Sequence, residues 1–393
     1  MGGTAAGLDV WAVEPYFGGS HRQFLEGYAR HSTHRLTMQT LPGRHWKWRM
    51  HGGALALAGQ ARESAASGWS PQVLLASSML DLPTYLSLAP VGRPATMLYF
   101  HENQLTYPLP AGVDRDLGYG MRQVASALAA DAVYFNTRFH RDEFLAAAAE
   151  LWAQVPDQAP EWVPERLAAR SAVLHVGCDL RRFDEFHDRG VAASQSGRWG
   201  DPAAGPLIVW NQRWEYDKAP GALFAGLAAL ADAGVPFRVA VAGPNRGLPT
   251  AEFVEGRRRL GDRVVQWGRL ERFADYAALL WAADLVVSTA LHEFFGVAVV
   301  EALYCGCRPV LPRRLSYPEL IPVQAHAQVL YDEGDFVPAV RRALAAPKEW
   351  SPDWQRTWVA PYDWGSLVLR YDDEVWMCWE RSAARGHAIG WGG

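Results

Sequence analysis

Short apolar runs alternate with amphipathic stretches along almost the whole chain. Helical patterns such as 21–29 and 117–130 fall between several of these runs. The runs are continuous rather than alternating with polar residues, as in parallel strands that are covered on both faces. In the first half of the chain they lie at 10–13, 36–41, 73–76, 97–100, 133–135 and 173–176. The pattern therefore predicts an α/β domain with a doubly wound parallel sheet.

A second series of strands follows a break in this pattern. Residues 186–206 lose periodicity and are rich in Gly, Ser, Asp and Pro, which is typical of a linker. Apolar runs resume at 207–210, 239–242, 264–267, 285–288, 309–311 and 329–331.

The two series predict two doubly wound (Rossmann-like) domains, at 1–185 and 207–362, with ligands in the cleft between them at the carboxyl ends of the strands. An amphipathic helix at 364–380 lies in the tail, 363–393, and we expect it to brace the first domain.

Composition limits the classes of protein that the chain can represent. At 393 residues it is too long for a single core, which agrees with two domains. No apolar run is long enough to cross a membrane, and the N-terminus has no signal-peptide pattern. Four cysteines are too few for a disulfide framework. We therefore expect a cytoplasmic protein with no membrane partner. Because the net charge is −4, a nucleic acid would need a local basic patch.

Two glutamates lie eight residues apart at a predicted strand–turn–helix junction. Gly296 is at the turn, and the first-turn amides of Phe295, Gly296 and Val297 are suited to binding a phosphate. Glu293 precedes the helix, and Glu301 lies about 12 Å further along it at the helical rise. One carboxylate can reach a sugar and the other a ribose. On spacing alone, two solvated acids beside a buried helix start are an equal alternative.

Two cations follow the first strand of the second series. Arg213 and Lys218 are placed where a guanidinium fork and an ammonium could meet a diphosphate, although each alone is typical of a solvated surface. Together with the helix start they indicate a diphosphate site that needs no metal, since no Asp-x-Asp pair stands out as a ligand set. Fixed positive groups would then stabilise a leaving nucleoside diphosphate.

The first domain carries polar residues where its strands are predicted to end. Gly18 and Gly19 follow the first strand and could let the backbone approach an oxyanion closely, or form an ordinary strand-to-helix turn. His101 could bind a hydroxyl or transfer a proton, and a hydrogen-bonded loop histidine is the alternative. It belongs to a run of four polar residues at the end of a strand: His101, Glu102, Asn103 and Gln104.

One segment of the first domain interleaves cations with aromatic rings. Phosphates and unstacked bases need this mixture, whereas a solvated loop with tryptophans anchored in the core is the alternative. Because the chain is acidic overall, a local basic patch is more informative than it would be in a basic protein. The segment consists of Arg44, His45, Trp46, Lys47, Trp48 and Arg49.

These motifs resemble two nested families. The pair Glu293 and Glu301, with Arg213 and Lys218, resembles the signature of family 4 retaining glycosyltransferases, which have the glycosyltransferase-B fold. More narrowly, the strings at 14–21, 41–49 and 99–108 are similar to the N-terminal half of the tRNA-queuosine mannosyltransferases. The resemblance covers nearly all of the chain apart from the linker and the extreme termini.

The resemblance implies transfer of mannose from GDP-mannose to the cyclopentenediol of queuosine in the anticodon of tRNA-Asp, with retention at the anomeric carbon and no metal. Arg213 and Lys218 would neutralise the diphosphate, Glu293 would hold the sugar, Glu301 the ribose, and His101 would contact the donor sugar. The further donor-binding residues would be Gly18, Gly19, Gly243, Trp267, Phe295, Gly296 and Val297.

The acceptor side is placed by location only. Residues 44–49 and 102–104 would face the tRNA. Two other hypotheses stay open: a family 4 transferase with another sugar donor or with a lipid or glycan acceptor, and a non-catalytic tRNA-binding module on the same fold.

Overall fold

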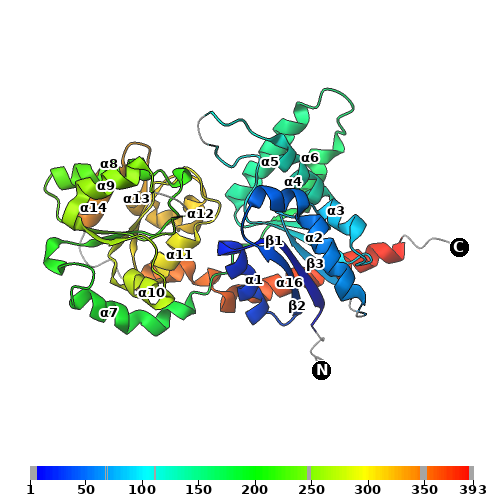
Figure 1. Cartoon of the computed structure of the whole chain (residues 1–393), viewed down its shortest axis with the longest axis horizontal. Helices are drawn as coiled ribbons and strands as arrows, with labels where there is room; N and C mark the ends of the chain where they lie inside the picture. Colours follow the sequence, from blue (N-terminus) through cyan, green and yellow to red (C-terminus); the bar gives the residue numbers. More distant parts are fainter. Residues whose placement is uncertain are drawn as a thin grey trace. The chain divides into compact units, whose positions relative to one another are not determined.

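The computed structural model describes residues 7–66, 68, 70–109, 112–245, 249–345 and 352–388. The chain forms two compact units, each built around its own parallel sheet (Figure 1). Unit 1 consists of Met1–Cys178 and Trp364–Gly393, and unit 2 of Asp179–Asp363. The predicted α/β class with two doubly wound sheets is confirmed.

Unit 1 contains six parallel strands in the order β2-β1-β3-β4-β5-β6. The order reverses between β1 and β3, and such a reversal opens a crevice outside the carboxyl ends of the strands. The strands are β1 (Asp9–Phe17), β2 (Arg35–Pro42), β3 (Val73–Ser77), β4 (Ala95–Phe100), β5 (Ala132–Phe135) and β6 (Ser171–Val173).

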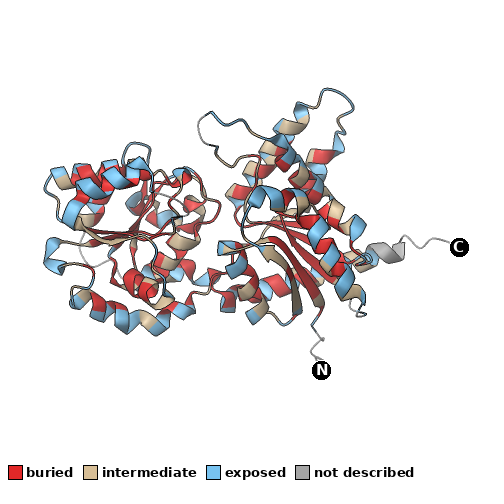
Figure 2. Cartoon of the chain, viewed as in Figure 1, coloured by how far each residue is buried: buried red, intermediate tan, exposed pale blue. Residues whose placement is uncertain are grey.

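Helices cover both faces of this sheet, and Figure 2 shows the central strands between them as largely buried, whereas β2 and β6 are mostly half-buried. Trp11, Leu74, Phe100 and Phe135 lie in one apolar cluster with side chains from the covering helices. The helices are α1 (Gly19–His31), α2 (Trp46–Ala66), α3 (Leu82–Leu88), α4 (Leu117–Ala129), α5 (Arg138–Ala153), α6 (Trp162–Arg170) and α16 (Trp364–Ala388).

The C-terminal helix α16 returns to unit 1 and packs on α1. Trp364 is buried against the rings of Phe24 and Tyr28. Gly27 and Gly177 make room for it, because an added Cβ would lie 2.0 Å and 2.4 Å from the indole. At the other end of the contact, the carboxylate of Asp372 accepts hydrogen bonds from the side chains of three residues near the end of α1: Tyr28, Ser32 and Thr33.

Unit 2 contains a second sheet of six parallel strands, in the order β12-β11-β10-β7-β8-β9. Here the order reverses between β7 and β10. The strands are β7 (Leu207–Trp210), β8 (Arg238–Val241), β9 (Val264–Trp267), β10 (Leu285–Val287), β11 (Arg308–Pro312) and β12 (Leu330–Tyr331). The helices are α7 (His187–Gln195), α8 (Pro220–Asp232), α9 (Ala251–Leu260), α10 (Phe273–Ala282), α11 (Val297–Tyr304), α12 (Tyr317–Leu320), α13 (His326–Val329), α14 (Phe336–Ala345) and α15 (Pro352–Val359).

The linker expected at 186–206 needs correction. This range contains α7 and a short 3-10 helix, Pro202–Ala204, and it belongs to unit 2, whose boundaries fall at 178/179 and 363/364. Helix α7 packs on α10, where Asp275 accepts hydrogen bonds from Arg189 and Arg198 at 2.7 Å and 2.9 Å. The buried positions of α7 are the small residues Gly190 and Ala193, so the helix shows little hydrophobic period in the sequence. In the part of the chain that the structure describes, no helix is both long and apolar enough to cross a membrane.

Replacing Trp364 tests how much α16 contributes to unit 1. Trp364→Ala should lower the free energy of unfolding by about 3–5 kcal/mol, because it leaves a large cavity between α16 and α1. Leu369→Ala on the exposed face of the same helix should change it by less than about 0.5 kcal/mol. Urea unfolding followed by circular dichroism measures both, and equal effects of the two variants would contradict the packing described.

Candidate active site

The polar residues of unit 2 gather where β7 and β10 end, at the reversal of the strand order. Strand β7 leads into Arg213 and a 3-10 helix, Tyr216–Lys218, and β10 leads into the loop that carries Glu293. The two loops meet at Lys218, whose ammonium lies 3.2 Å from a carboxylate oxygen of Glu293. Two residues predicted from separate motifs, 75 positions apart, are therefore in direct contact.

Lys218 is buried and fully engaged. Its Nζ donates to the carbonyl of His292 at 2.6 Å and lies 3.1 Å from the carboxylate of Asp217. Burying an ammonium is unfavourable unless it is paired, and here two carboxylates surround it. Asp217 was not among the residues predicted from the sequence, in which its position next to Lys218 is the only signal for it. Arg213 is the more exposed cation and contacts Glu215 at 3.1 Å.

His292 lies beside this cluster and stays neutral. Burial is the main cause that lowers its pKa, to about 3, and the nearby charge of Lys218 lowers it further. The imidazole therefore adds no charge at neutral pH. Lys218 and Arg213 are the two cations here; Lys218 lies between the carboxylates of Asp217 and Glu293, and Arg213 is the more exposed of the two.

The predicted strand–turn–helix junction is present. Gly296 has φ 102°, a left-handed conformation that favours glycine, and α11 begins at the next residue, Val297. The carbonyl of Gly296 accepts from the amides of Val299 and Val300. The first-turn amides of an α-helix have no partner within it, so this end of α11 is suited to an anion. Phe295 is buried, with its ring against Tyr362, so it supports the turn.

Glu301 belongs to a second polar cluster on α11. Its carboxylate accepts from the hydroxyl of Tyr276 at 2.7 Å, and the side-chain amide of Asn211 donates to the same hydroxyl at 3.0 Å. Burial raises the pKa of Glu301 to about 7, and the bonds from Tyr276 and the charge of Arg182 oppose that rise. Near neutral pH the side chain therefore exists in both protonation states, and its ionised form accepts hydrogen bonds from hydroxyl groups of a ligand.

Gly243 and Trp267 lie at the ends of β8 and β9. An added Cβ on Gly243 would lie 1.8 Å from the carbonyl oxygen of Gln212, so glycine lets the loops after β7 and β8 touch. The ring of Trp267 packs against Trp214 at 4.9 Å, with the guanidinium of Arg257 at 5.3 Å from its centroid. Both residues shape the ends of these strands, and contact with a nucleotide stays a prediction.

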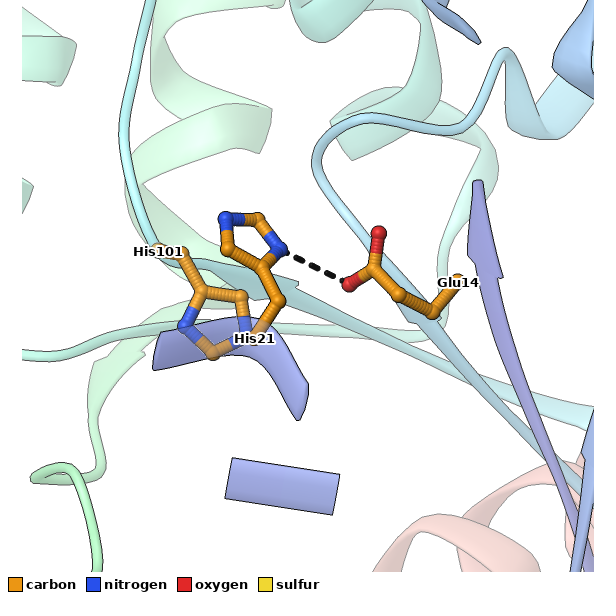
Figure 3. A group of neighbouring side chains, drawn as sticks. All are labelled: Glu14, His21 and His101. Carbon is orange, nitrogen blue, oxygen red and sulfur yellow. Dashed lines mark hydrogen bonds and ion pairs between the residues drawn. The ribbon is translucent and has the colours of Figure 1, made fainter. Parts of the chain in front are cut away.

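In unit 1 a buried cluster forms where β1 and β4 end (Figure 3). Glu14 comes from β1, His21 from the first turn of α1, and His101 follows β4. The carboxylate of Glu14 lies 2.9 Å from Nδ1 of His21, and the rings of His21 and His101 are 4.2 Å apart. Among the described residues these three form the group whose ligand atoms, within 4.8 Å of one another, could hold a metal ion.

The glycine turn after β1 touches the start of the basic segment. The amide of Gly43 donates to the carbonyl of Phe17 at 3.1 Å, and an added Cβ on Gly43 would lie 2.7 Å from the Cα of Gly18. Gly19 has φ 55°, so glycine is favoured there as well. The predicted phosphate turn and the predicted RNA segment are therefore in backbone contact inside unit 1.

The basic–aromatic segment, residues 44–49, opens α2 and is largely exposed. Trp48 is 75% exposed, which rules out the alternative that it anchors in the core. Trp46 is less exposed, and its ring lies 5.2 Å from that of Tyr119. Arg44, His45 and Lys47 are exposed as well, while the guanidinium of Arg49 donates to the carbonyl of Pro42.

Within the run 102–104, Asn103 is buried, whereas Glu102 and Gln104 are half-buried and their acceptor role stays a prediction. Asn103 is fully buried, and its side chain bonds Thr106 through both its amide and its carbonyl oxygen. The side-chain amide of Gln104 donates to Glu102 at 3.2 Å. The expectation that Asn103 faces an acceptor therefore needs correction, since this residue holds the loop together.

The raised pKa of Glu301 predicts how the free energy of unfolding depends on pH. An acid whose pKa is about 7 when folded and near 4.5 otherwise destabilises the fold as pH rises between those values. Glu301→Gln should therefore stabilise the free protein at pH 8 by roughly 1–3 kcal/mol, with no difference below about pH 4.5. Urea unfolding across pH measures this. The exposed Glu271→Gln is the control, and a pH-independent effect of Glu301→Gln would contradict the assignment.

Comparison with known proteins agrees with this arrangement. A family model described as tRNA-queuosine alpha-mannosyltransferase N-terminal matches residues 9–178, and one described as glycosyl transferases group 1 matches residues 205–346. A tRNA-queuosine alpha-mannosyltransferase of Drosophila melanogaster is 34% identical over 315 residues, 80% of this chain and 81% of the relative. A GDP-mannose-dependent alpha-(1-6)-phosphatidylinositol dimannoside mannosyltransferase of Mycobacterium tuberculosis is 28% identical over 88% of this chain and 85% of that protein.

Solved structures show the same fold. Sucrose-phosphate synthase from Thermosynechococcus elongatus superposes with a TM-score of 0.70 at 16% identity, and the catalytic domain of starch synthase IV from Arabidopsis thaliana with 0.69 at 11%. Each match covers 95% of this chain and the whole of the other. At this identity they show the fold alone, which is the predicted glycosyltransferase-B fold. With the sequence matches to both of its units, the chain belongs to the tRNA-queuosine alpha-mannosyltransferase family of group 1 glycosyltransferases.

Proposed function

We propose that this protein transfers mannose from GDP-mannose to the cyclopentenediol of queuosine in the anticodon of tRNA-Asp, with retention of the anomeric configuration. The observation that carries the proposal is the pairing, in one chain, of a cation–carboxylate cluster at the strand reversal of unit 2 with an exposed basic–aromatic segment in unit 1. The first suits a nucleotide sugar, and the second suits an RNA loop.

The donor is assigned from chemistry and from relatives. Lys218 and Arg213 supply positive charge for a diphosphate, and the start of α11 at Gly296 supplies amides for its oxygens. Glu301, with its hydrogen-bonded carboxylate, suits the ribose diol. Several relatives carry GDP-mannose in their names, including the Mycobacterium enzyme and a GDP-mannose:cellobiosyl-diphosphopolyprenol alpha-mannosyltransferase of Xanthomonas campestris. GDP-mannose is the donor that satisfies both lines of support.

The chemical step follows from where charge develops. As the glycosidic bond to the phosphate breaks, negative charge grows on the diphosphate, and Arg213 and Lys218 stabilise it more strongly in the transition state than in the ground state. Front-face attack by the acceptor hydroxyl, with its proton passing to the leaving phosphate, gives retention without a covalent intermediate. Glu293 then holds sugar hydroxyls, and its ion pair with Lys218 fixes its position.

The acceptor side uses the segment 44–49. Its exposed cations can contact backbone phosphates, and Trp48 offers a ring on which an unstacked base of the anticodon loop can lie. The contact between Gly43 and Gly18 joins this segment to the glycine turn, where the donor phosphate is expected.

Transfer itself is the first test. The purified protein with GDP-mannose should convert queuosine-containing tRNA-Asp to a species one hexose heavier, detected by mass spectrometry of the digested tRNA. Arg213→Ala should lower the rate on the order of 10²–10³-fold, as for loss of a transition-state charge contact. The exposed Arg269→Ala in the same unit serves as the control and should leave the rate unchanged. Absence of mass gain with any nucleotide hexose would contradict the function, and gain on a lipid acceptor alone would reassign it.

RNA binding is tested at the exposed tryptophan. Trp48→Ala should weaken binding of queuosine-modified tRNA by about 1–3 kcal/mol, the usual value of one base–aromatic stack, and Trp48→Phe should retain most of it. Fluorescence anisotropy at fixed salt measures the affinity. Trp162→Ala is a matched control, because that ring is 52% exposed on α6 of the same unit and is expected to have no effect. If both alanine variants bind tRNA like the parent protein, the RNA surface lies elsewhere.

A further inference from the structure

Hydrogen bonds from two neighbouring elements hold the carboxyl group of Glu301 in place. The hydroxyl of Tyr276, on α10, donates to Oε2 of Glu301 at 2.7 Å. The side-chain amide of Asn211, directly after β7, donates to that hydroxyl at 3.0 Å and to the carbonyl of Ala298 at 2.8 Å. Ala298 lies in the first turn of α11, the helix that carries Glu301. The contacts therefore join a strand end and two helices around one carboxyl group.

The partners of Asn211 determine the direction of these hydrogen bonds. The carbonyl of Ala298 can only accept, so the group of Asn211 that faces it is the amide nitrogen. The second hydrogen of that nitrogen is donated to the hydroxyl oxygen of Tyr276. Because this oxygen already accepts from Asn211, the single hydrogen of the hydroxyl is available to its other partner, Glu301.

The hydrogen bond from Tyr276 leaves the other oxygen of Glu301 for a ligand. Within the described ranges of the chain, Oε1 of Glu301 has no hydrogen-bond partner, and the residue is half-buried rather than enclosed. Rotation of the carboxyl group about its last bond would break the bond to Tyr276, so Oε1 keeps a fixed direction. A carboxylate oxygen can accept two hydrogen bonds, which matches the two adjacent hydroxyls of a ribose.

The loop after β7 connects this arrangement to the proposed diphosphate site. Asn211 is buried and lies two residues before Arg213 in the same loop. Between them, the side-chain amide of Gln212 donates to the hydroxyl of Ser288 at 2.9 Å and fixes the loop on the end of β10. In a nucleoside diphosphate the ribose is joined to the diphosphate by a single methylene group. One anchored loop therefore serves two neighbouring parts of such a ligand.

We propose that Tyr276 and Asn211 are positioning residues, which direct the carboxyl group of Glu301 to the vicinal hydroxyls of the donor ribose and make the site selective for ribonucleotides. Neither residue touches a reacting atom. The inference rests on the proposed function for the presence of a nucleotide-sugar donor, and it adds the groups that set selectivity for its ribose. The selectivity arises because a ligand without the diol leaves the polar atoms of the site unpaired.

Binding of GDP and of 2′,3′-dideoxy-GDP to the full chain, measured by calorimetry, tests this role. The parent protein should bind GDP at least about 10-fold more tightly than the dideoxy form. In Tyr276→Phe this ratio should fall to about threefold or less, because only the affinity for GDP depends on the direction of Glu301. A general disturbance of the fold would instead weaken both ligands alike and leave the ratio unchanged.

Tyr304→Phe is the matched control for this measurement. It also removes a hydroxyl from the surroundings of α11, but that hydroxyl donates to Asp184 at 2.9 Å and accepts from Arg356 at 2.7 Å. The ratio of the two affinities should therefore stay at the parent value in Tyr304→Phe.

A double-mutant cycle separates positioning from direct contact with the ligand. Glu301→Ala should itself remove most of the selectivity, and adding Tyr276→Phe should then change the ratio no further, because Tyr276 acts through Glu301. Asn211→Ala should lower the ratio in the same direction as Tyr276→Phe. An unchanged ratio in Tyr276→Phe, or effects of Tyr276→Phe and Glu301→Ala that multiply, would overturn the proposal.

The result is independent of the test of the proposed function, because binding of GDP requires neither tRNA nor sugar transfer. If the protein binds GDP with this selectivity and transfers no hexose, the proposed function fails and the positioning role stands. If GDP, UDP and ADP bind no more tightly than their dideoxy forms, the positioning role fails, even where the tRNA gains a hexose.

Discussion

A parallel sheet that is covered on both faces leaves few places for polar chemistry. Its strands must be apolar throughout, and the helices that connect them bury their inner faces as well. Figure 2 shows this in both units, where the central strands are buried and the exposed residues lie mainly on helix surfaces and loops. Polar side chains can then gather only where strands end, and the reversal of strand order opens space there. Lys218 and Glu293 lie at such a reversal in unit 2, and Glu14 lies at the corresponding reversal in unit 1.

Charged side chains at the strand ends are poorly solvated. Pairing with an opposite charge or a hydrogen-bond donor offsets the free energy of burying them. Lys218 has two carboxylate neighbours, Asp217 and Glu293, so its charge is satisfied before any ligand binds. Glu14 is satisfied by His21 and by a backbone amide. Glu301 accepts a hydrogen bond from the hydroxyl of Tyr276, and Arg182 lies at longer range. Its pKa stays raised because these contacts do not fully offset the burial of its charge. The four carboxylates thus differ in how far their hydrogen-bonding capacity is already used within the protein.

Sequence patterns predicted the elements and the residue types at strand ends, because both follow from local periodicity and turn chemistry. Gly296 is an example, since a left-handed turn before a helix favours glycine. Contacts between distant segments were beyond such patterns. The contacts of Asp217 are visible only in the structure, where the loop after β10 bonds to its backbone. The contact of His21 is likewise visible only there, because β1 and α1 bring Glu14 within 2.9 Å of it. Asn103 misled for the opposite reason, because a polar residue at a strand end can serve its own loop. Helix α7 was missed because the residues on its buried face, Gly190 and Ala193, are small and give little apolar signal.

Two glycines of unit 1 bring the turn after β1 into backbone contact with the residue that precedes segment 44–49. An added Cβ would lie 2.7 Å from Gly18 if placed on Gly43 and 3.1 Å from Gly43 if placed on Gly18, and Gly43 directly precedes the exposed segment 44–49. The same turn after β1 begins α1, which carries His21. The segment that we propose binds RNA is therefore supported by the same turn that leads into the first turn of α1, where His21 lies. Because closely packed backbone has little room to deform, the segment 44–49 and the start of α1 are held in one rigid frame.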